Sequence, residues 1–139
     1  MGRYYVDTSA LMKRAYGEAE SRALRSWFDG NAAGNQLLFT SALTVVEVER
    51  GLRSLAARGL PLNERIGSLV PAALAGLSVT ELTNSVLQMA RWIGPDNLRS
   101  LDAIHLATAV LNGAAAMVTY DQRLAEAAKT VGLSVITPA

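Results

Sequence analysis

Four acidic residues follow apolar runs or lie in the first turns of predicted helices, and their types and positions best suit chemistry. They are Asp7, Glu47, Asp102 and Asp121. Asp7 follows the run Arg3–Val6, and Asp121 follows the run Ala116–Tyr120 in the same manner. Ligands of open α/β sheets bind beyond the carboxyl ends of the strands, so two such strands can bring both acids to one edge. This repetition indicates a site built from carboxylates.

A carboxylate cluster in this chain is suited to a hard divalent cation. The sequence contains no cysteine and one histidine, which excludes thiolate zinc sites and histidine-rich metal sites. Mg²⁺ and Mn²⁺ prefer carboxylate and water oxygens, and Mg²⁺ commonly binds one or two protein carboxylates together with substrate phosphates. Such a cation activates a water molecule to attack phosphorus and stabilises the departing oxygen. The four acids therefore predict a metal-dependent nuclease.

Each of these acids also has a purely structural interpretation. Asp102 comes just after Ser100, in the first turn of a predicted apolar helix, where a negative charge gains from the helix dipole. Asp121 can cap the helix that it precedes. Glu47 matches a capping box with Thr44, in which the glutamate only reaches back to the first free amide of its helix. The sequence leaves these alternatives open.

The predicted helix around Glu47 carries a second glutamate, Glu49. The apolar stripe between Val45 and Leu55 runs nearer to Glu49, so helical spacing does not decide which glutamate enters a site. Glu49 and Arg53 are spaced as a surface i,i+4 pair, which favours Glu47 for function.

Short apolar runs alternate with helical patterns along the chain, which predicts an α/β fold with a mostly parallel sheet between helices. The predicted strands are Arg3–Val6, Leu37–Thr40, Leu77–Val79, Ala116–Thr119 and Ser134–Ile136. The predicted helices are Ala10–Tyr16, Ala19–Phe28, Leu43–Arg58, Leu62–Ala73, Asn84–Ile93, Leu101–Leu111 and Gln122–Val131.

Capping residues and glycines help to locate the helix ends. The residues expected at helix starts are Ser41 or Thr44, Pro61, Thr83 or Asn84, Ser100 and Asp121. The glycines expected at helix ends are Gly30, Gly94, Gly113 and Gly132. The segment Gly51–Pro71 reads as an amphipathic helical hairpin, whose apolar stripe packs either on the protein's own core or on a partner.

Length and composition indicate one domain spanning residues 1–139. No apolar run approaches the ~20 residues needed to cross a bilayer, and no signal sequence is evident, so we expect a cytoplasmic protein. The net charge is only +1, which provides no strong overall attraction for nucleic acid. Eleven of the thirteen basic residues are arginine, which suits phosphate or carboxylate binding, although codon bias would give the same count.

Four motifs occur in a characteristic order. They are Tyr5-Val6-Asp7-Thr8-Ser9-Ala10-Leu11, Thr40-Ser41-Ala42-Leu43-Thr44-Val45-Val46-Glu47-Val48-Glu49-Arg50-Gly51, Leu101-Asp102-Ala103-Ile104-His105-Leu106-Ala107-Thr108-Ala109 and Val118-Thr119-Tyr120-Asp121-Gln122-Arg123-Leu124. In this order they resemble the PIN-domain family, in particular the VapC toxins of bacterial VapBC toxin–antitoxin modules. The resemblance covers essentially the whole chain and implies the α/β/α PIN fold.

The resemblance implies a role for each acid. Asp7 and Asp102 resemble the principal metal ligands, while Glu47 and Asp121 resemble acids that complete the site directly or through water. The aliphatic residue and the arginine that follow the family's second acid fit Glu47, not Glu49. The hydroxyls that resemble supporting groups are those of Thr8, Ser9 and Thr119. His105 we interpret as a structural residue of its helix, because hydrolysis by metal-activated water requires no histidine.

The resemblance further implies a Mg²⁺- or Mn²⁺-dependent endoribonuclease that acts on RNA, forms a homodimer and is silenced by a cognate VapB-type antitoxin. No membrane association is expected, nor direct DNA binding without the antitoxin. A solitary PIN nuclease in RNA processing is the nearest alternative. A phosphoaspartate phosphatase would place a second aspartate where Ser9 stands, and a non-enzymatic interaction module would use the acids only as caps.

Overall fold

Five parallel strands form the central sheet in a computed structural model that describes residues 2–17, 19–32 and 34–139. The spatial order is β3-β2-β1-β4-β5. The strands are β1 (Arg3–Val6), β2 (Leu37–Ser41), β3 (Ser78–Thr80), β4 (Ala116–Val118) and β5 (Ser134–Ile136). The predicted parallel α/β architecture is confirmed, and each strand ends within one residue of its predicted end.

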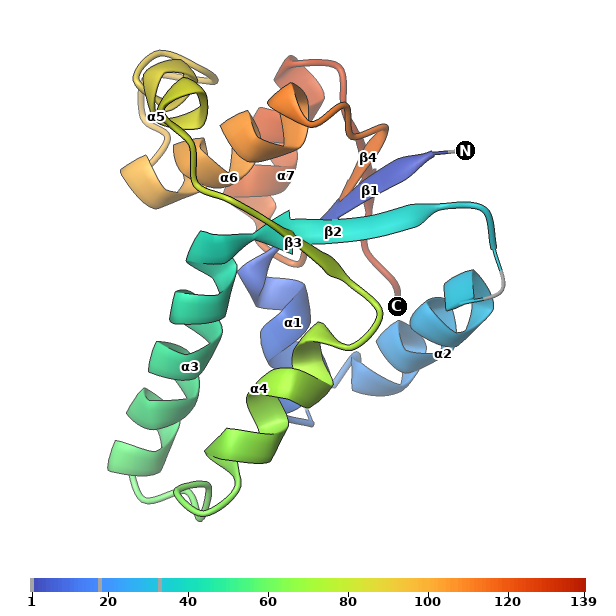
Figure 1. The fold of residues 1–139 in the computed structure, drawn as a ribbon, viewed down its shortest axis with the longest axis vertical. Coiled ribbons are helices and arrows are strands. Elements are labelled where there is room, and N and C mark those ends of the chain that lie inside the picture. Colours follow the sequence, from blue (N-terminus) through green and yellow to red (C-terminus); the bar gives the residue numbers. More distant parts are fainter. Residues whose placement is uncertain (1, 18, 33) are drawn as a thin grey trace.

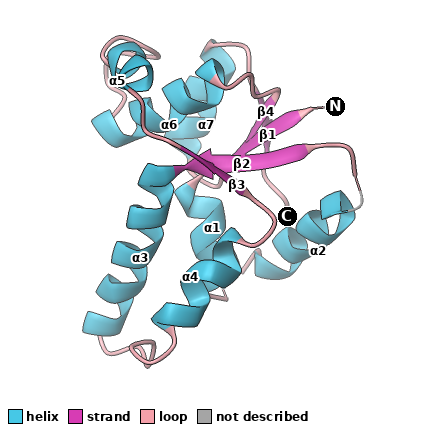
Figure 2. Cartoon of the chain, viewed as in Figure 1, coloured by secondary structure: helices cyan, strands magenta, loops and turns pink. Residues whose placement is uncertain are grey.

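Helices cover both faces of the sheet (Figure 1). Figure 2 shows that α1 to α4 lie on one side, and α5 to α7 on the other. The helices are α1 (Thr8–Ala15), α2 (Ser21–Ala32), α3 (Ala42–Ala57), α4 (Ile66–Leu74), α5 (Asn84–Ala90), α6 (Ser100–Leu111) and α7 (Gln122–Thr130). Within the described part of the chain, no helix is long and apolar enough to cross a membrane.

Alternation along β1 divides its side chains between two apolar cores. Val6 packs with the residues of α1 to α4, whereas Tyr5 packs with Leu106 of α6 and Leu124 of α7. Successive side chains of a strand point to opposite faces of the sheet, so one central strand supports both layers. Both side chains are fully buried.

The order of the strands creates a switch point between β1 and β4. The chain runs outward from β1 to β2 and β3, and then crosses back to add β4 on the other side of β1. In open α/β sheets such a reversal leaves a crevice beyond the carboxyl ends of the two strands. Asp7 directly follows β1, and Thr119 directly follows β4.

Several predicted helix ends were wrong. The fourth helix begins at Ile66 rather than after Pro61, because residues 62–65 form a separate turn closed by a hydrogen bond from the Arg65 amide to the Leu62 carbonyl. The second helix continues through Gly30 to Ala32, since glycine weakens a helix without stopping it.

Other helix ends were also shifted, by smaller amounts. The fifth helix ends at Ala90, three residues early, although Gly94 does take the left-handed conformation that follows it. Ser100 is the first helical residue of α6 and provides no side-chain cap. The predicted caps Ser41, Thr83 and Asp121 are confirmed.

The apolar stripe of the α3–α4 hairpin packs on the protein's own core. Leu52, Leu62 and Ile66 are buried in the cluster that also contains Leu11 of α1. The first of the two predicted alternatives therefore holds for these side chains.

Candidate active site

Asp7 is a buried carboxylate held by three donors. Its side chain is the N-cap of α1, where Oδ1 accepts the backbone N–H of Ala10 at 3.1 Å. The hydroxyl of Ser9 also donates to Oδ1, at 2.7 Å, and the hydroxyl of Thr119 donates to Oδ2 at 2.6 Å. Ser9 in turn accepts the backbone N–H of Tyr120, so it joins the ends of β1 and β4.

Burial dominates the electrostatics of Asp7, which is 2% exposed. Desolvation raises its pKa above the ordinary 3.8, and the hydrogen bonds from Thr119, Ser9 and Ala10 only partly oppose this. A carboxylate in such a place is costly to ionise unless a positive charge joins it. The cap is therefore real, but a cap alone does not require an acid buried this deeply.

Glu47 lies on α3 and is held from two other elements. The hydroxyl of Thr8 at the start of α1 donates to its Oε1 at 2.7 Å, and Nε2 of His105 on α6 lies 2.5 Å from the same oxygen. Burial raises the pKa of Glu47, but the hydrogen bonds from His105 and Thr8, with the histidine's charge, outweigh it and leave the pKa lowered.

The choice between Glu47 and Glu49 is thereby decided at the level of structure. Ser41 caps α3 instead of Thr44, so the capping-box interpretation of Glu47 is wrong. Glu49 pairs with Arg53 at 3.0 Å, as its spacing predicts, and its side chain is 45% exposed against 23% for Glu47.

Asp102 and Asp121 line an open hollow of about 390 Å³ together with Arg99, Gln122 and Arg123. Asp102 lies in the first turn of α6, as predicted. Burial raises its pKa, and the nearby charges of Asp121 and Glu47 raise it further, against the opposing effect of His105 and Arg99.

Asp121 is attached to the Asp7 cluster through the backbone. Its Oδ1 accepts the backbone N–H groups of Arg123 and Leu124, and its own N–H donates to the hydroxyl of Thr119 at 3.0 Å. Thr119 therefore contacts both Asp7 and Asp121, as a supporting hydroxyl should.

The structure brings the four acids together as neighbours but not as a closed cage. Across residues 2–17, 19–32 and 34–139, no three acidic or histidine side chains are arranged to enclose a metal ion. The donor chemistry nevertheless fits Mg²⁺ or Mn²⁺, which retain water ligands and need few protein carboxylates. Glu47 and Asp121 are each anchored through one oxygen, which leaves the other for such a ligand.

Sequence reasoning missed the partners of His105. The histidine is indeed buried and hydrogen-bonded, as a structural residue should be, but its ring bridges the phenol of Tyr5 and the carboxylate of Glu47. No local signal links residues so far apart in the sequence. Only the apolar surroundings of His105 in a helix hinted that its ring would need buried partners.

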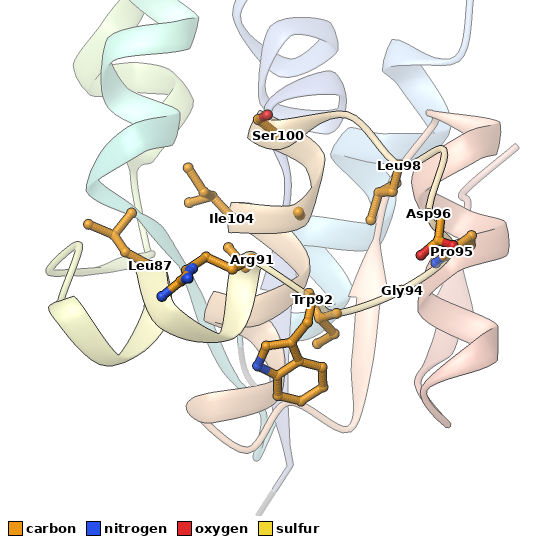
Figure 3. A pocket seen from close by; sticks show the side chains of 12 residues that line it. Leu87, Arg91, Trp92, Gly94, Pro95, Asp96, Leu98, Ser100 and Ile104 are labelled. Atoms are coloured by element: carbon orange, nitrogen blue, oxygen red, sulfur yellow. The ribbon is translucent and has the colours of Figure 1, made fainter.

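A second hollow, of about 370 Å³, lies apart from the acids. It is formed by α5, the following loop and α6, and Figure 3 shows Arg91, Trp92 and Asp96 among its lining side chains. None of the four acids lines it. Trp92 is 71% exposed.

Known proteins resemble this chain over nearly its whole length. The model of the PIN-domain family matches residues 4–130. The chain is 42% identical over 138 residues to ribonuclease VapC35 of Mycobacterium tuberculosis, with 96% of each chain covered. It is 40% identical over 137 residues to ribonuclease VapC47 of the same species, again with 96% of each covered.

The fold also matches solved structures. The crystal structure of Mycobacterium tuberculosis VapC20, described as a Sarcin-Ricin loop cleaving toxin, matches with a TM-score of 0.74 at 16% identity, over 97% of this chain and 99% of that one. The toxin in a DNA-bound VapBC complex from Salmonella typhimurium matches with a TM-score of 0.68 at 18% identity, over 98% of both chains. With its parallel sheet and full-length sequence matches, the chain belongs to the PIN-domain family and, within it, to the VapC group.

Proposed function

We propose that this protein is a metal-dependent endoribonuclease and the toxin of a VapBC toxin–antitoxin module. The observation that carries the proposal is the gathering of Asp7, Glu47, Asp102 and Asp121 around the switch point of the sheet, in a chain related to VapC ribonucleases. The raised pKa values of Asp7 and Asp102 are consistent with carboxylates that await a cation.

In this proposal Asp7 and Asp102 are the principal ligands of Mg²⁺ or Mn²⁺, and Glu47 and Asp121 complete the site. The cation supplies activation of water and stabilisation of phosphate charge when it is bound. Thr8, Ser9 and Thr119 hold carboxylates in place by hydrogen bonds. Ser9 donates to Asp7 where a phosphoaspartate enzyme would have its second acid, which disfavours that alternative.

The direct test is cleavage of single-stranded RNA by the purified chain. We expect cleavage with Mg²⁺ or Mn²⁺, loss of cleavage with a chelator, and at least a 100-fold loss in Asp102→Asn, because the amide keeps the shape but not the charge. Glu64→Gln, at an exposed acid in the turn before α4, is the control and should cleave normally. Cleavage by Asp102→Asn at the normal rate would contradict the assignment.

The same variants test the toxin function in cells. Expression of the chain without an antitoxin should arrest growth, and Asp102→Asn should relieve the arrest. Arrest that persists with this variant would point to a mechanism other than nuclease activity. Absence of arrest, together with RNA cleavage in vitro, would favour a solitary PIN nuclease in RNA processing.

We extend the proposal to assembly, with a homodimer bound by a VapB-type antitoxin. Supporting observations are the exposed apolar side chains of Val79, Leu87 and Trp92 beside the edge strand β3, and the toxin–antitoxin complexes among the structural neighbours. Such patches commonly mark association sites. Light scattering should give twice the monomer mass for the wild type and a lower mass for Trp92→Ser; a monomeric wild type would contradict the dimer.

A further inference from the structure

The buried ring of His105 connects the core to one of the four acids. Its Nδ1 lies 2.5 Å from the phenol oxygen of Tyr5, and its Nε2 lies 2.5 Å from Oε1 of Glu47. Tyr5 is fully buried and His105 is 3% exposed, so water does not compete for either contact. Tyr5 comes from β1, His105 from α6 and Glu47 from α3, so the connection spans three elements.

We propose that His105 is a positioning residue for the nuclease reaction: Tyr5 fixes its tautomer, and its Nε2–H then holds the carboxylate of Glu47. This inference rests on the proposed function, because it concerns the same acids. It assigns a role to a histidine that otherwise reads only as a buried core residue.

The direction of the hydrogen bonds follows from the two ends of the connection. Burial raises the pKa of the Tyr5 phenol, so it keeps its proton and donates to Nδ1. Glu47 has a lowered pKa, so its carboxylate is ionised and can only accept. Nε2 must therefore carry a proton, because an unprotonated nitrogen at 2.5 Å from a carboxylate oxygen would be repelled.

The contacts also orient Glu47. Nε2 of His105 and the hydroxyl of Thr8 both address Oε1 of Glu47. In the described part of the chain Oε2 has no protein donor, so it is the oxygen left for a cation or a water molecule. Two donors on one oxygen fix the rotation of the carboxylate, which a single donor would leave free.

The first test reads the histidine directly and needs no cation. His105 is the only histidine of the chain, so the imidazole nitrogen signals in an NMR spectrum belong to it alone. We expect a proton on Nε2, and a clear change of the imidazole shifts in Glu47→Gln and Tyr5→Phe. An unprotonated Nε2, or shifts unchanged in both variants, would overturn the proposal.

The second test separates positioning from folding. Removing an outer partner of a ligand typically costs 10- to 100-fold in activity or metal affinity, so we expect such a loss of kcat in His105→Leu with little change in KM. His105→Gln should recover part of it, because its amide N–H can reach the same carboxylate. Thr108→Val, which removes another buried hydroxyl of α6, is the control and should retain kcat.

The outcomes distinguish this inference from the proposed function. If Asp102→Asn and Glu47→Gln lose cleavage while His105→Leu is folded and fully active, the nuclease stands and the positioning role fails. If the wild type does not cleave RNA, the nuclease itself fails, and the nitrogen shifts alone decide whether His105 holds Glu47. Should His105→Leu not fold, Tyr5→Phe provides the same comparison with a smaller change.

Discussion

Asp7 combines a structural contact with an electrostatic cost. Its carboxylate caps α1 and accepts hydroxyls from Ser9 and Thr119, yet burial raises its pKa above 3.8. A neutral side chain of the same shape could make most of these contacts. The charge is therefore the part that folding does not need, and function is the reason we give for it.

At the residue scale, Asp7→Asn should abolish RNA cleavage without lowering the melting temperature measured with a chelator present. Because the folded pKa of Asp7 lies above the unfolded value, ionised Asp7 destabilises the fold at neutral pH. The wild type should regain this stability as the pH falls through the folded pKa towards 3.8. The stability advantage of Asp7→Asn should thus shrink with acidification; an advantage that grows would contradict the raised pKa.

The loop between α5 and α6 depends on one glycine. Gly94 has φ +77, and a Cβ there would lie 3.0 Å from Leu98 and 3.3 Å from Leu106. The backbone conformation and the close approach both favour glycine at this position. The loop leads into Arg99 and the first turn of α6, so its geometry positions Asp102.

At the element scale, Gly94→Ala should lower the free energy of unfolding by about 1–3 kcal/mol, the usual range for a strained residue of this kind. Gly76→Ala is a matched control, because Gly76 has φ +81 but open space where the Cβ would be. Urea denaturation of both variants separates backbone strain from crowding. Equal losses would show that Leu98 and Leu106 give way easily.

Charge on the whole molecule is nearly balanced, so any attraction for RNA must be local. The net charge is +1. Arg99 and Arg123 line the same hollow as Asp102 and Asp121, and both arginines are exposed. A phosphate backbone entering this hollow would meet guanidinium groups beside the acids.

At the whole-molecule scale, Arg123→Gln should weaken RNA binding, measured by fluorescence anisotropy with a chelator present. Loss of one phosphate contact to a single strand should reduce the salt dependence of log K by about 0.7. Arg53→Gln, whose arginine pairs with Glu49 on α3, is the control. An unchanged salt slope for Arg123→Gln would mean that the RNA does not pass this hollow.

Local sequence patterns were sufficient for the parallel α/β class, the strands and the caps at Ser41, Thr83 and Asp121, because these depend on neighbours within a few residues. The start of α4 was not predicted, because buried Leu62 is held in a separate turn. The choice of Glu47 over Glu49 had only indirect support, from the possible Arg53 pair and from the family resemblance.

The tertiary structure alone decided how the acids are held. His105 is 58 residues from Glu47 and 100 residues from Tyr5, and Thr119 is 112 residues from Asp7. Such contacts exist only because β4 crosses back beside β1 and α6 packs over it. The sequence by itself determined which carboxylates are available, and the packing of distant elements decided which of their oxygens are anchored and which remain free.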